Sequence, residues 1–551
     1  MAASVAEVVG RTVVDLGVEQ VFGVVGSGNF HVTNAMLEAG ARYVAARHEG
    51  GAATMADAYA RLSGTVAALS LHQGCGLTNA LTGITEAAKS RTPLLVLAGE
   101  TAAGAIASNF RIDQPALATA VGAVPMRVTS GATAVRETVE AYRCAQEERR
   151  TVLLGLPLDV QAAAVPDEAT AAAVRRPSTL PAPSADAVDE LTTILADARR
   201  PVLIAGRGAR HAGPELRDLA AACGALLATS AVAKGLFQGD QWDLDVAGGF
   251  STPTAADLIR GADVVVAFGC GLNMWTTRHG RLLAPDATLV QVDLDRDALG
   301  RHRPIALGVV ADTGLTAQAV AATLADRGGD PAGQGYRQPE VAERLDAGRR
   351  WRDEPYEDWG DAHHIDPRTL TIALDDLLPT ERVVAVDSGN FMGYPSMFLD
   401  VPDERGFCFT QAFQSIGLGL ATGIGAALAQ PDRVPVIAVG DGGLTMAASE
   451  LETLARLALP AVVVVYDDSG YGAEVHHFGA DARLDTVVFP PTDHAAIARG
   501  YGLDAVTVRR TDDLEPVERW VDGWRDRPLL IDAKVASPRG SWWLEEAFRG
   551  H

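Results

Sequence analysis

Short runs of apolar, mostly β-branched residues recur along the chain, each followed by a glycine-rich or polar turn and then by apolar residues at helical spacing. The clearest example begins with the run 434–439, which ends in Gly440-Asp441-Gly442-Gly443. Apolar residues then repeat with a helical period until Pro460, and a second apolar run covers 461–466. This pattern predicts a strand–helix–strand unit, with Ser449 and Glu452 as a capping box for its helix.

The same alternation divides the chain into three parts. In residues 1–165 it predicts helices over 6–16 and 52–62 and strands over 21–25, 43–46, 66–71, 94–98 and 151–156. Residues 187–325 contain runs at 200–205, 264–268 and 289–292, and residues 362–551 open with a run at 383–386. We therefore predict an α/β fold of three domains, each a mainly parallel, doubly wound sheet, joined by linkers over 166–183 and 326–361.

A short repeat relates the first and third parts. The sequence Ser-Gly-Asn-Phe occurs after a predicted strand at 27–30 and again at 388–391. A repeated turn at corresponding places suits two domains of similar topology.

Composition limits the classes of function. The 551 residues exceed what one core holds, and the 48% hydrophobic and 21% charged fractions are those of a packed protein. A net charge of −23 argues against nucleic acid or an anionic membrane as partner. Five dispersed cysteines without a CxxC pair, no signal-peptide pattern and no long apolar run lead us to expect a cytoplasmic protein.

Two aspartates follow neighbouring strands of the predicted unit. A right-handed crossover lays its two strands parallel, so Asp441 and Asp468 should emerge at the same carboxyl edge of the sheet. Two carboxylates beside glycine backbone amides at a helix start suit a divalent cation bound to a phosphorylated ligand. The alternative is that the glycines only make turns and the aspartates only cap or solvate loops.

The stretch 440–472 resembles the thiamine diphosphate (ThDP) signature of the pyruvate decarboxylase and acetolactate synthase superfamily, in which Gly-Asp-Gly precedes a pair of asparagines. The resemblance implies that Asp441, Asp468 and the carbonyl of Gly470 hold Mg²⁺ or another divalent cation. It also implies that Gly442 and Gly443 face the diphosphate. This chain departs from the family pattern because Asp467-Asp468 replaces the two asparagines.

An added carboxylate attracts the metal and repels the phosphates. Each such charge pair is worth on the order of 4 kcal/mol at ~4 Å and an effective dielectric near 20. We predict that ThDP binding is more metal-dependent than in an asparagine-bearing relative. Tight binding in excess chelator would contradict this.

The sequence around Glu49, RHEGGAATMADAYAR, resembles the glutamate motif of the same family. The resemblance implies that Glu49 binds the N1′ atom of the aminopyrimidine ring and favours the imino tautomer, whose 4′ nitrogen removes the C2 proton to give the ylide. A carboxylate buried against an organic ring suits this role because desolvation raises its pKa. Without this resemblance, a glutamate at this position has an alternative interpretation as a negative charge that stabilises the N-terminus of a helix.

The resemblance implies further site residues. Gln114 is expected near the substrate and Glu474 in protonation or release of the product, so both join Glu49 as catalytic candidates; a surface-loop glutamine is the alternative for Gln114. The expected cofactor contacts are Gly74, Gly76, Asn79, Gly389, Asn390, Phe391, Ile416 and Tyr471, with Ile416 bending the cofactor unless it is a core residue. The stretch 271–278 does not resemble a flavin-contacting sequence, so we do not expect FAD.

The preferred function is a ThDP-dependent decarboxylase or carboligase acting on a 2-oxo acid, similar to acetolactate synthase, through a C2 ylide and an enamine intermediate. One alternative is a lyase that cleaves a 2-hydroxy ketone or a 2-hydroxyacyl-CoA. Another is a non-catalytic cofactor-binding or regulatory homologue, against which the presence of Glu49 argues. The resemblance also implies a homodimer or homotetramer in which the Glu49 domain of one subunit faces the Asp441 domain of another.

Overall fold

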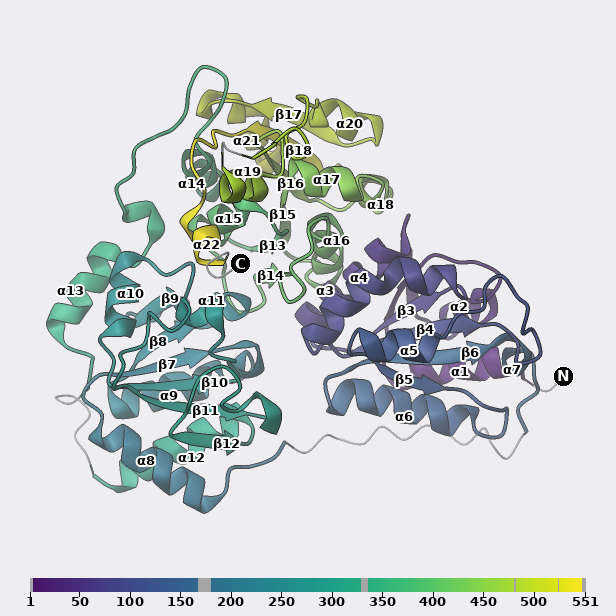
Figure 1. Ribbon diagram of the computed structural model, residues 1–551, viewed down its shortest axis with the longest axis horizontal. Coiled ribbons are helices and arrows are strands. Elements are labelled where there is room, and N and C mark those ends of the chain that lie inside the picture. Colours follow the sequence, from purple (N-terminus) through teal and green to yellow (C-terminus); the bar gives the residue numbers. More distant parts are fainter. Residues whose placement is uncertain (1–2, 167–179, 329–334, 480–481, 524, 548–551) are drawn as a thin grey trace.

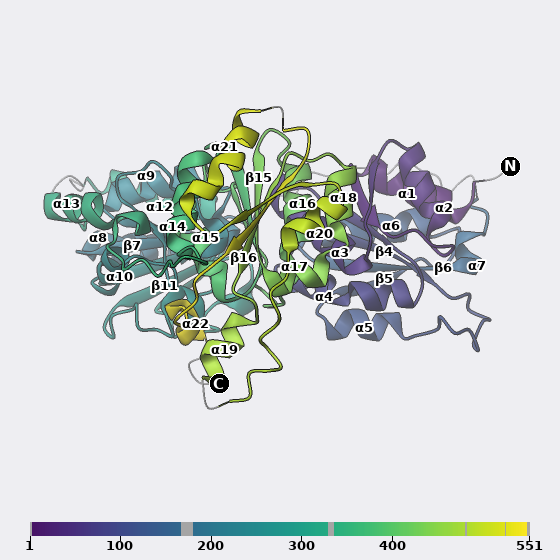
Figure 2. The same ribbon diagram turned by 90° about the horizontal axis from the view of Figure 1, so that it is seen from above.

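The computed structural model describes residues 3–166, 180–328, 335–479, 482–523 and 525–547. This part of the chain forms three six-stranded sheets with parallel strand pairing, which confirms the predicted α/β fold. In the view of Figure 1 the third domain lies at the top, above the middle domain on the left and the first domain on the right, and Figure 2 shows the same arrangement from above. Most of the predicted linker at 166–183 lies outside the described residues.

The first domain has the sheet order β2-β1-β3-β4-β6-β5. The central strands of this sheet are mostly apolar and almost completely buried, as expected for parallel strands covered on both faces. Its strands are β1 (Gln20–Gly23), β2 (Arg42–Ala45), β3 (Ala67–Leu71), β4 (Leu94–Glu100), β5 (Val124–Arg127) and β6 (Thr151–Pro157). Its helices are α1 (Val5–Asp15), α2 (Phe30–Glu38), α3 (Glu49–Ser63), α4 (Cys75–Lys89), α5 (Gln114–Ala120), α6 (Ala134–Glu147) and α7 (Leu158–Gln161).

The third domain has the sheet order β14-β13-β15-β16-β18-β17, which is the order of the first domain once the strands are counted from its own start. The repeated Ser-Gly-Asn-Phe therefore follows β1 and β13, the equivalent strands of two domains with one topology. Its strands are β13 (Arg382–Val386), β14 (Phe407–Phe409), β15 (Val434–Gly440), β16 (Val462–Asp467), β17 (Asp504–Val508) and β18 (Leu529–Lys534). Its helices are α14 (Pro367–Leu377), α15 (Gly393–Phe398), α16 (Gly419–Ala429), α17 (Asp441–Ala447), α18 (Glu450–Arg456), α19 (Gly472–Phe478), α20 (His494–Gly500), α21 (Glu515–Asp522) and α22 (Trp542–Ala547).

The middle domain has a different order, β12-β11-β10-β7-β8-β9, in which the chain reverses direction across the sheet between β7 and β10. Its strands are β7 (Pro201–Ala205), β8 (Leu226–Thr229), β9 (Asp243–Val246), β10 (Val264–Phe268), β11 (Thr288–Asp293) and β12 (Leu307–Val310). Its helices are α8 (Ala185–Asp197), α9 (Gly213–Cys223), α10 (Pro253–Arg260), α11 (Met274–Thr277) and α12 (Thr313–Asp326).

Two local predictions differ from the structure. The polar stretch 326–361 contains helix α13 (Pro339–Gly348), whose Val341 and Leu345 are buried in the core of the middle domain. Two apolar residues among charged ones are too few to show a helical period. The predicted capping box at Ser449 is also wrong, because Ser449 has helical backbone angles and its side chain caps no backbone N–H. The helical segment instead starts at Asp441, directly after β15.

Helix α3 of the first domain packs against α16 of the third, and small residues permit this close approach. A Cβ atom at Gly425 would lie 2.3 Å from the backbone oxygen of Met55. Ala52, Ala53 and Ile424 belong to one buried cluster that joins the two domains. Among the described residues, no helix is long and apolar enough to cross a membrane.

Candidate active site

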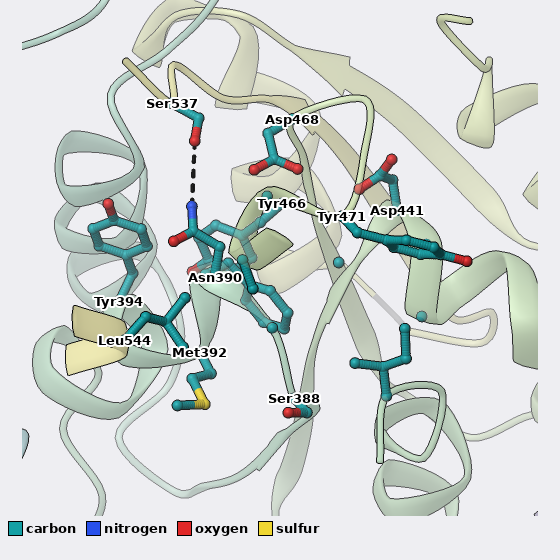
Figure 3. Close-up of a pocket in the computed structure, with 18 of the residues that line it drawn as sticks. Ser388, Asn390, Met392, Tyr394, Asp441, Tyr466, Asp468, Tyr471, Ser537 and Leu544 are labelled. Atoms are coloured by element: carbon teal, nitrogen blue, oxygen red, sulfur yellow. Dashed lines mark hydrogen bonds between the residues drawn. The ribbon is translucent and has the colours of Figure 1, made fainter. Parts of the chain in front are cut away.

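A cavity of about 410 Å³ opens at the carboxyl ends of β13, β15 and β16, where parallel α/β sheets place their ligand sites (Figure 3). Most of its lining comes from the third domain, with Met274 and Trp275 from the middle domain. The predicted site residues that line it are Gly389, Asn390, Phe391, Ile416, Asp441, Gly442, Gly443, Asp468, Gly470, Tyr471 and Glu474. The fold thus collects in one place the residues that the sequence assigned to the cation and the diphosphate.

The two aspartates reach the cavity from neighbouring strands. Strands β15 and β16 pair in parallel with Gly440 opposite Tyr466, so Asp441 and Asp468 leave the sheet at the same edge. Burial, together with the charges of Asp468 and Asp467, raises the pKa of Asp441 to about 8. Burial also raises the pKa of Asp468 to about 6, against the hydrogen bonds of Ser537 and Asn390. Crowded carboxylates of this kind are stabilised by a bound cation.

The glycines around the aspartates allow a close approach of neighbouring groups that any side chain would prevent. A Cβ atom at Gly442 would lie 2.5 Å from the ring of Tyr471, and one at Gly443 would lie 2.4 Å from Asp387 Oδ2. The donors on offer are carboxylate and backbone oxygens, which suit a hard divalent cation. The residues therefore fit a cation held by Asp441, Asp468 and Gly470 beside a diphosphate bound at the glycine turn.

Asp387 fixes the segment that carries Ile416. It is fully buried at the end of β13 and accepts hydrogen bonds from the backbone N–H groups of Gly417 at 2.9 Å and Leu418 at 3.2 Å. Burial raises the pKa of Asp387 to about 6. The sequence analysis missed this residue, because an aspartate after a strand reads only as the start of a turn.

A hydrogen-bonded chain of side chains lies on the other side of the cavity. Asn390 Nδ2 donates to Ser537 Oγ at 3.2 Å, and His476 Nε2 lies 3.0 Å from the same oxygen. Glu474 lines the cavity from α19, and Leu544 closes it from α22. Ser537 was not expected from sequence, because only the pairing of β18 with β16 brings its loop to this site.

The glutamate of the first domain is held in a defined position. Asn79 Nδ2 donates to Glu49 Oε2 at 2.9 Å, and a Cβ atom at Gly76 would lie 3.7 Å from Glu49 Oε1. Glu450 of α18 accepts from the backbone N–H groups of Arg47 at 3.1 Å and His48 at 3.0 Å, which anchors the turn before α3. Within the described chain, no residue of the first domain lines the Asp441 cavity.

Gln114 lies away from the Asp441 cavity, at a second cavity of about 670 Å³ on the first domain. It is buried; its Oε1 accepts from the N–H of Gly74 at 3.0 Å and its Nε2 donates to the carbonyl of Gly99 at 3.1 Å. Gln114 is therefore not a surface-loop glutamine. Its amide holds the turn at Gly74, whose φ of +64° favours glycine.

The fold and this cavity define a class: three-domain α/β proteins with a ligand site at the carboxyl edge of a parallel sheet. Family models identify the particular family. The N-terminal TPP binding domain of thiamine pyrophosphate enzymes matches residues 3–117, their central domain matches 188–320 and their C-terminal TPP binding domain matches 387–533. The chain belongs to the thiamine pyrophosphate (ThDP) enzyme family, as the sequence motifs predicted, and is a ThDP-dependent enzyme.

Several relatives resemble the chain over nearly its whole length. A probable 2-ketoarginine decarboxylase of Pseudomonas aeruginosa is 30% identical over 92% of this chain and 89% of its own. A sulfoacetaldehyde acetyltransferase of Rhodobacter capsulatus is 27% identical over 96% and 94%. The acetolactate synthase isozyme 2 large subunit of Escherichia coli is 26% identical over 96% and 95%. These relatives share a family but not a substrate.

A solved structure has the same fold. The thiamine diphosphate-dependent 4-hydroxybenzoylformate decarboxylase of Rhodococcus jostii superposes with a TM-score of 0.83, at 23% identity over 97% of this chain and 99% of its own.

Proposed function

We propose that this enzyme uses ThDP and Mg²⁺, or another divalent cation, to decarboxylate a 2-oxo acid and then to protonate the product or join it to an acceptor carbonyl. The observation that carries the proposal is the single cavity in which Asp441, Asp468, the glycine turn, Ile416 and Glu474 meet. The decarboxylase, acetyltransferase and acetolactate synthase among the relatives support this reaction class.

Each site residue has a defined task in this reaction. When bound, ThDP supplies an electron sink for the carbon–carbon bond that breaks. Asp441, Asp468 and the Gly470 carbonyl hold the cation, and Glu49 carries a proton towards the pyrimidine nitrogen. Glu474 lines the cavity from α19 and would donate a proton to the product.

We propose that Glu49 reaches this cavity from a second subunit. Within one described chain Glu49 lies outside the cavity lining, so one chain alone does not complete the site. Large apolar side chains are exposed on the two domains that would meet: Phe30 (49%), Ile106 (77%), Phe413 (44%) and Met446 (58%). We propose that these side chains belong to the subunit interface of a homodimer or homotetramer.

The test is an assay of the purified protein with ThDP and Mg²⁺ on a panel of 2-oxo acids and 2-hydroxy ketones. We expect CO₂ release from at least one 2-oxo acid, and little from the E49Q variant. Cleavage of 2-hydroxy ketones without CO₂ release would favour the lyase. Inactivity of the ThDP-loaded wild type on both classes would contradict the proposal.

A further inference from the structure

Asp467, the first member of the aspartate pair, does not line the cavity. Asp467 and Lys534 are the last residues of the parallel strands β16 and β18 and lie opposite each other in the register. Lys534 Nζ forms a short ion pair with Asp467 Oδ2 and lies 2.9 Å from Asp532 Oδ1. Lys534 also donates to the carbonyl of Thr492 at 2.8 Å. Asp467 is therefore paired with a lysine, whereas Asp468 is the member of the aspartate pair that lines the cavity.

The neighbourhood of Asp467 is buried and acidic. Asp467 is 3% exposed and Asp532 is fully buried. Ligand-type oxygen and nitrogen atoms of Asp441, Asp467 and His494 lie within 4.8 Å of one another. An unpaired Asp467 would thus add a negative charge directly beside Asp441, where the effective dielectric is low.

The lysine ammonium also restricts the orientation of the Asp467 side chain. The backbone N–H of Ser469 donates to Asp467 Oδ1 at 2.9 Å while Lys534 binds Oδ2, so both carboxylate oxygens are engaged. Burial acts against the charged lysine, but the two aspartates raise the pKa of Lys534 and keep it protonated. Lys534 thus holds Asp467 in a fixed ion pair behind the cation site and shares its charge with Asp532.

We propose that Lys534 is a positioning residue of the cation site, which compensates the charge that Asp467 brings in place of the asparagine of the family signature. The ion pair leaves Asp468 as the only member of Asp467-Asp468 that offers its charge to the cation and the diphosphate. This inference rests on the proposed binding of ThDP with a divalent cation. It reduces the added negative charge on which our prediction of stronger metal dependence was based.

The test compares the ThDP affinity of K534M, D467N/K534M and K534R by calorimetry at one fixed Mg²⁺ concentration. In K534M the unpaired Asp467 should weaken ThDP binding by about ten-fold or more. Removing the unpaired charge in D467N/K534M should restore the affinity to within about three-fold of wild type, and K534R should resemble wild type.

K234M is the matched control, because Lys234 is a similarly buried lysine that pairs with Asp245 at 3.0 Å in the middle domain. It should lower the thermal unfolding temperature without changing the ThDP affinity. If K534M is too unstable to measure, a ThDP affinity of D467N/K534M more than about ten-fold below that of wild type still overturns the inference.

Two outcomes would overturn this inference alone: a K534M variant that binds ThDP as wild type does, or a D467N/K534M variant that binds more than about ten-fold more weakly than wild type. A wild-type protein that binds no ThDP at any Mg²⁺ concentration would overturn the proposed function as well.

Discussion

At the scale of single residues, the site contains buried carboxylates, whose charged forms would be more stable in water. Asp441 is 7% exposed and has Asp467 and Asp468 as neighbours, and its pKa of about 8 compares with an ordinary value of 3.8. An acidic group whose pKa is raised on folding destabilises the folded state at any pH above its pKa in the unfolded state. Below about pH 4 the metal-free protein does not bear this cost, because Asp441 is protonated in both the folded and the unfolded state. As the pH rises from there towards 8, the free energy of unfolding decreases.

We predict that the metal-free protein loses thermal stability between about pH 5 and pH 8 and that D441N loses less. At the upper end of this range D441N should unfold at a higher temperature than metal-free wild type, because its amide has no charge to desolvate. Calorimetric scans across the pH range check this. Mg²⁺ with ThDP should stabilise wild type but not D441N, and an equal pH dependence of both metal-free proteins would contradict the prediction.

The proposed role of Glu49 is the transfer of one proton. Replacing it by glutamine, a neutral side chain of the same shape, tests that role. We predict that E49Q lowers kcat by roughly 10²- to 10⁴-fold. Its ThDP affinity should change much less, because the proposed diphosphate and cation contacts lie in another domain. Steady-state rates and ThDP titration measure the two effects. E140Q, at an exposed site of α6, is the control and should match wild type in both.

At the scale of elements, the segment between β14 and α16 depends on a helix of the first domain. Glu86 of α4 is fully buried and accepts from the backbone N–H groups of Ala412 at 3.1 Å and Phe413 at 2.7 Å. Arg61 of α3 donates to the same carboxylate at 2.8 Å. The segment carries Gln411 and Ile416, which line the cavity, so a contact between domains fixes one wall of the site.

We predict that E86Q costs about 3–5 kcal/mol of unfolding free energy, because it leaves the buried Arg61 without one of its carboxylate partners. It should also weaken ThDP binding, since the wall that carries Ile416 loses an anchor. Denaturant unfolding and ThDP titration measure these effects. E381Q, whose 68% exposed side chain pairs with Arg433, is the control, and equal behaviour of the two variants would contradict the prediction.

At the scale of the whole molecule, the same sheet order occurs at the two ends of the chain, and each copy carries one half of the proposed site. The α3–α16 contact fixes how the two domains sit within one chain. Because Glu49 does not reach the cavity of its own chain, the proposed chemistry requires the second subunit.

Co-expression of differently tagged E49Q and D441N chains tests this arrangement. If sites form between subunits, each mixed dimer contains one site with both wild-type residues, and roughly a quarter of the wild-type activity should return. Co-expressed D441N and D468N should recover nothing, because both changes lie in one cavity. No recovery in the first mixture, with mixed dimers isolated by their tags, would contradict sites between subunits.

The sequence by itself determined the features that depend on neighbours along the chain. Apolar runs alternating with helical periods predicted the parallel sheets, and the crossover rule placed Asp441 and Asp468 at one sheet edge. The motifs around these residues and around Glu49 also predicted the family. Helix α13 was not predicted, because its few apolar residues pack on a surface that only the folded middle domain provides.

The tertiary structure decided which buried charges find partners. Lys534 is an ordinary lysine in the sequence, and it becomes the partner of Asp467 only through the register of β18 on β16. Glu86 and Glu450 likewise act on segments more than three hundred residues away along the chain. Hydrophobic periodicity is a local property that sequence displays, whereas a buried charge is stabilised by whatever the folded chain brings within a few ångströms of it.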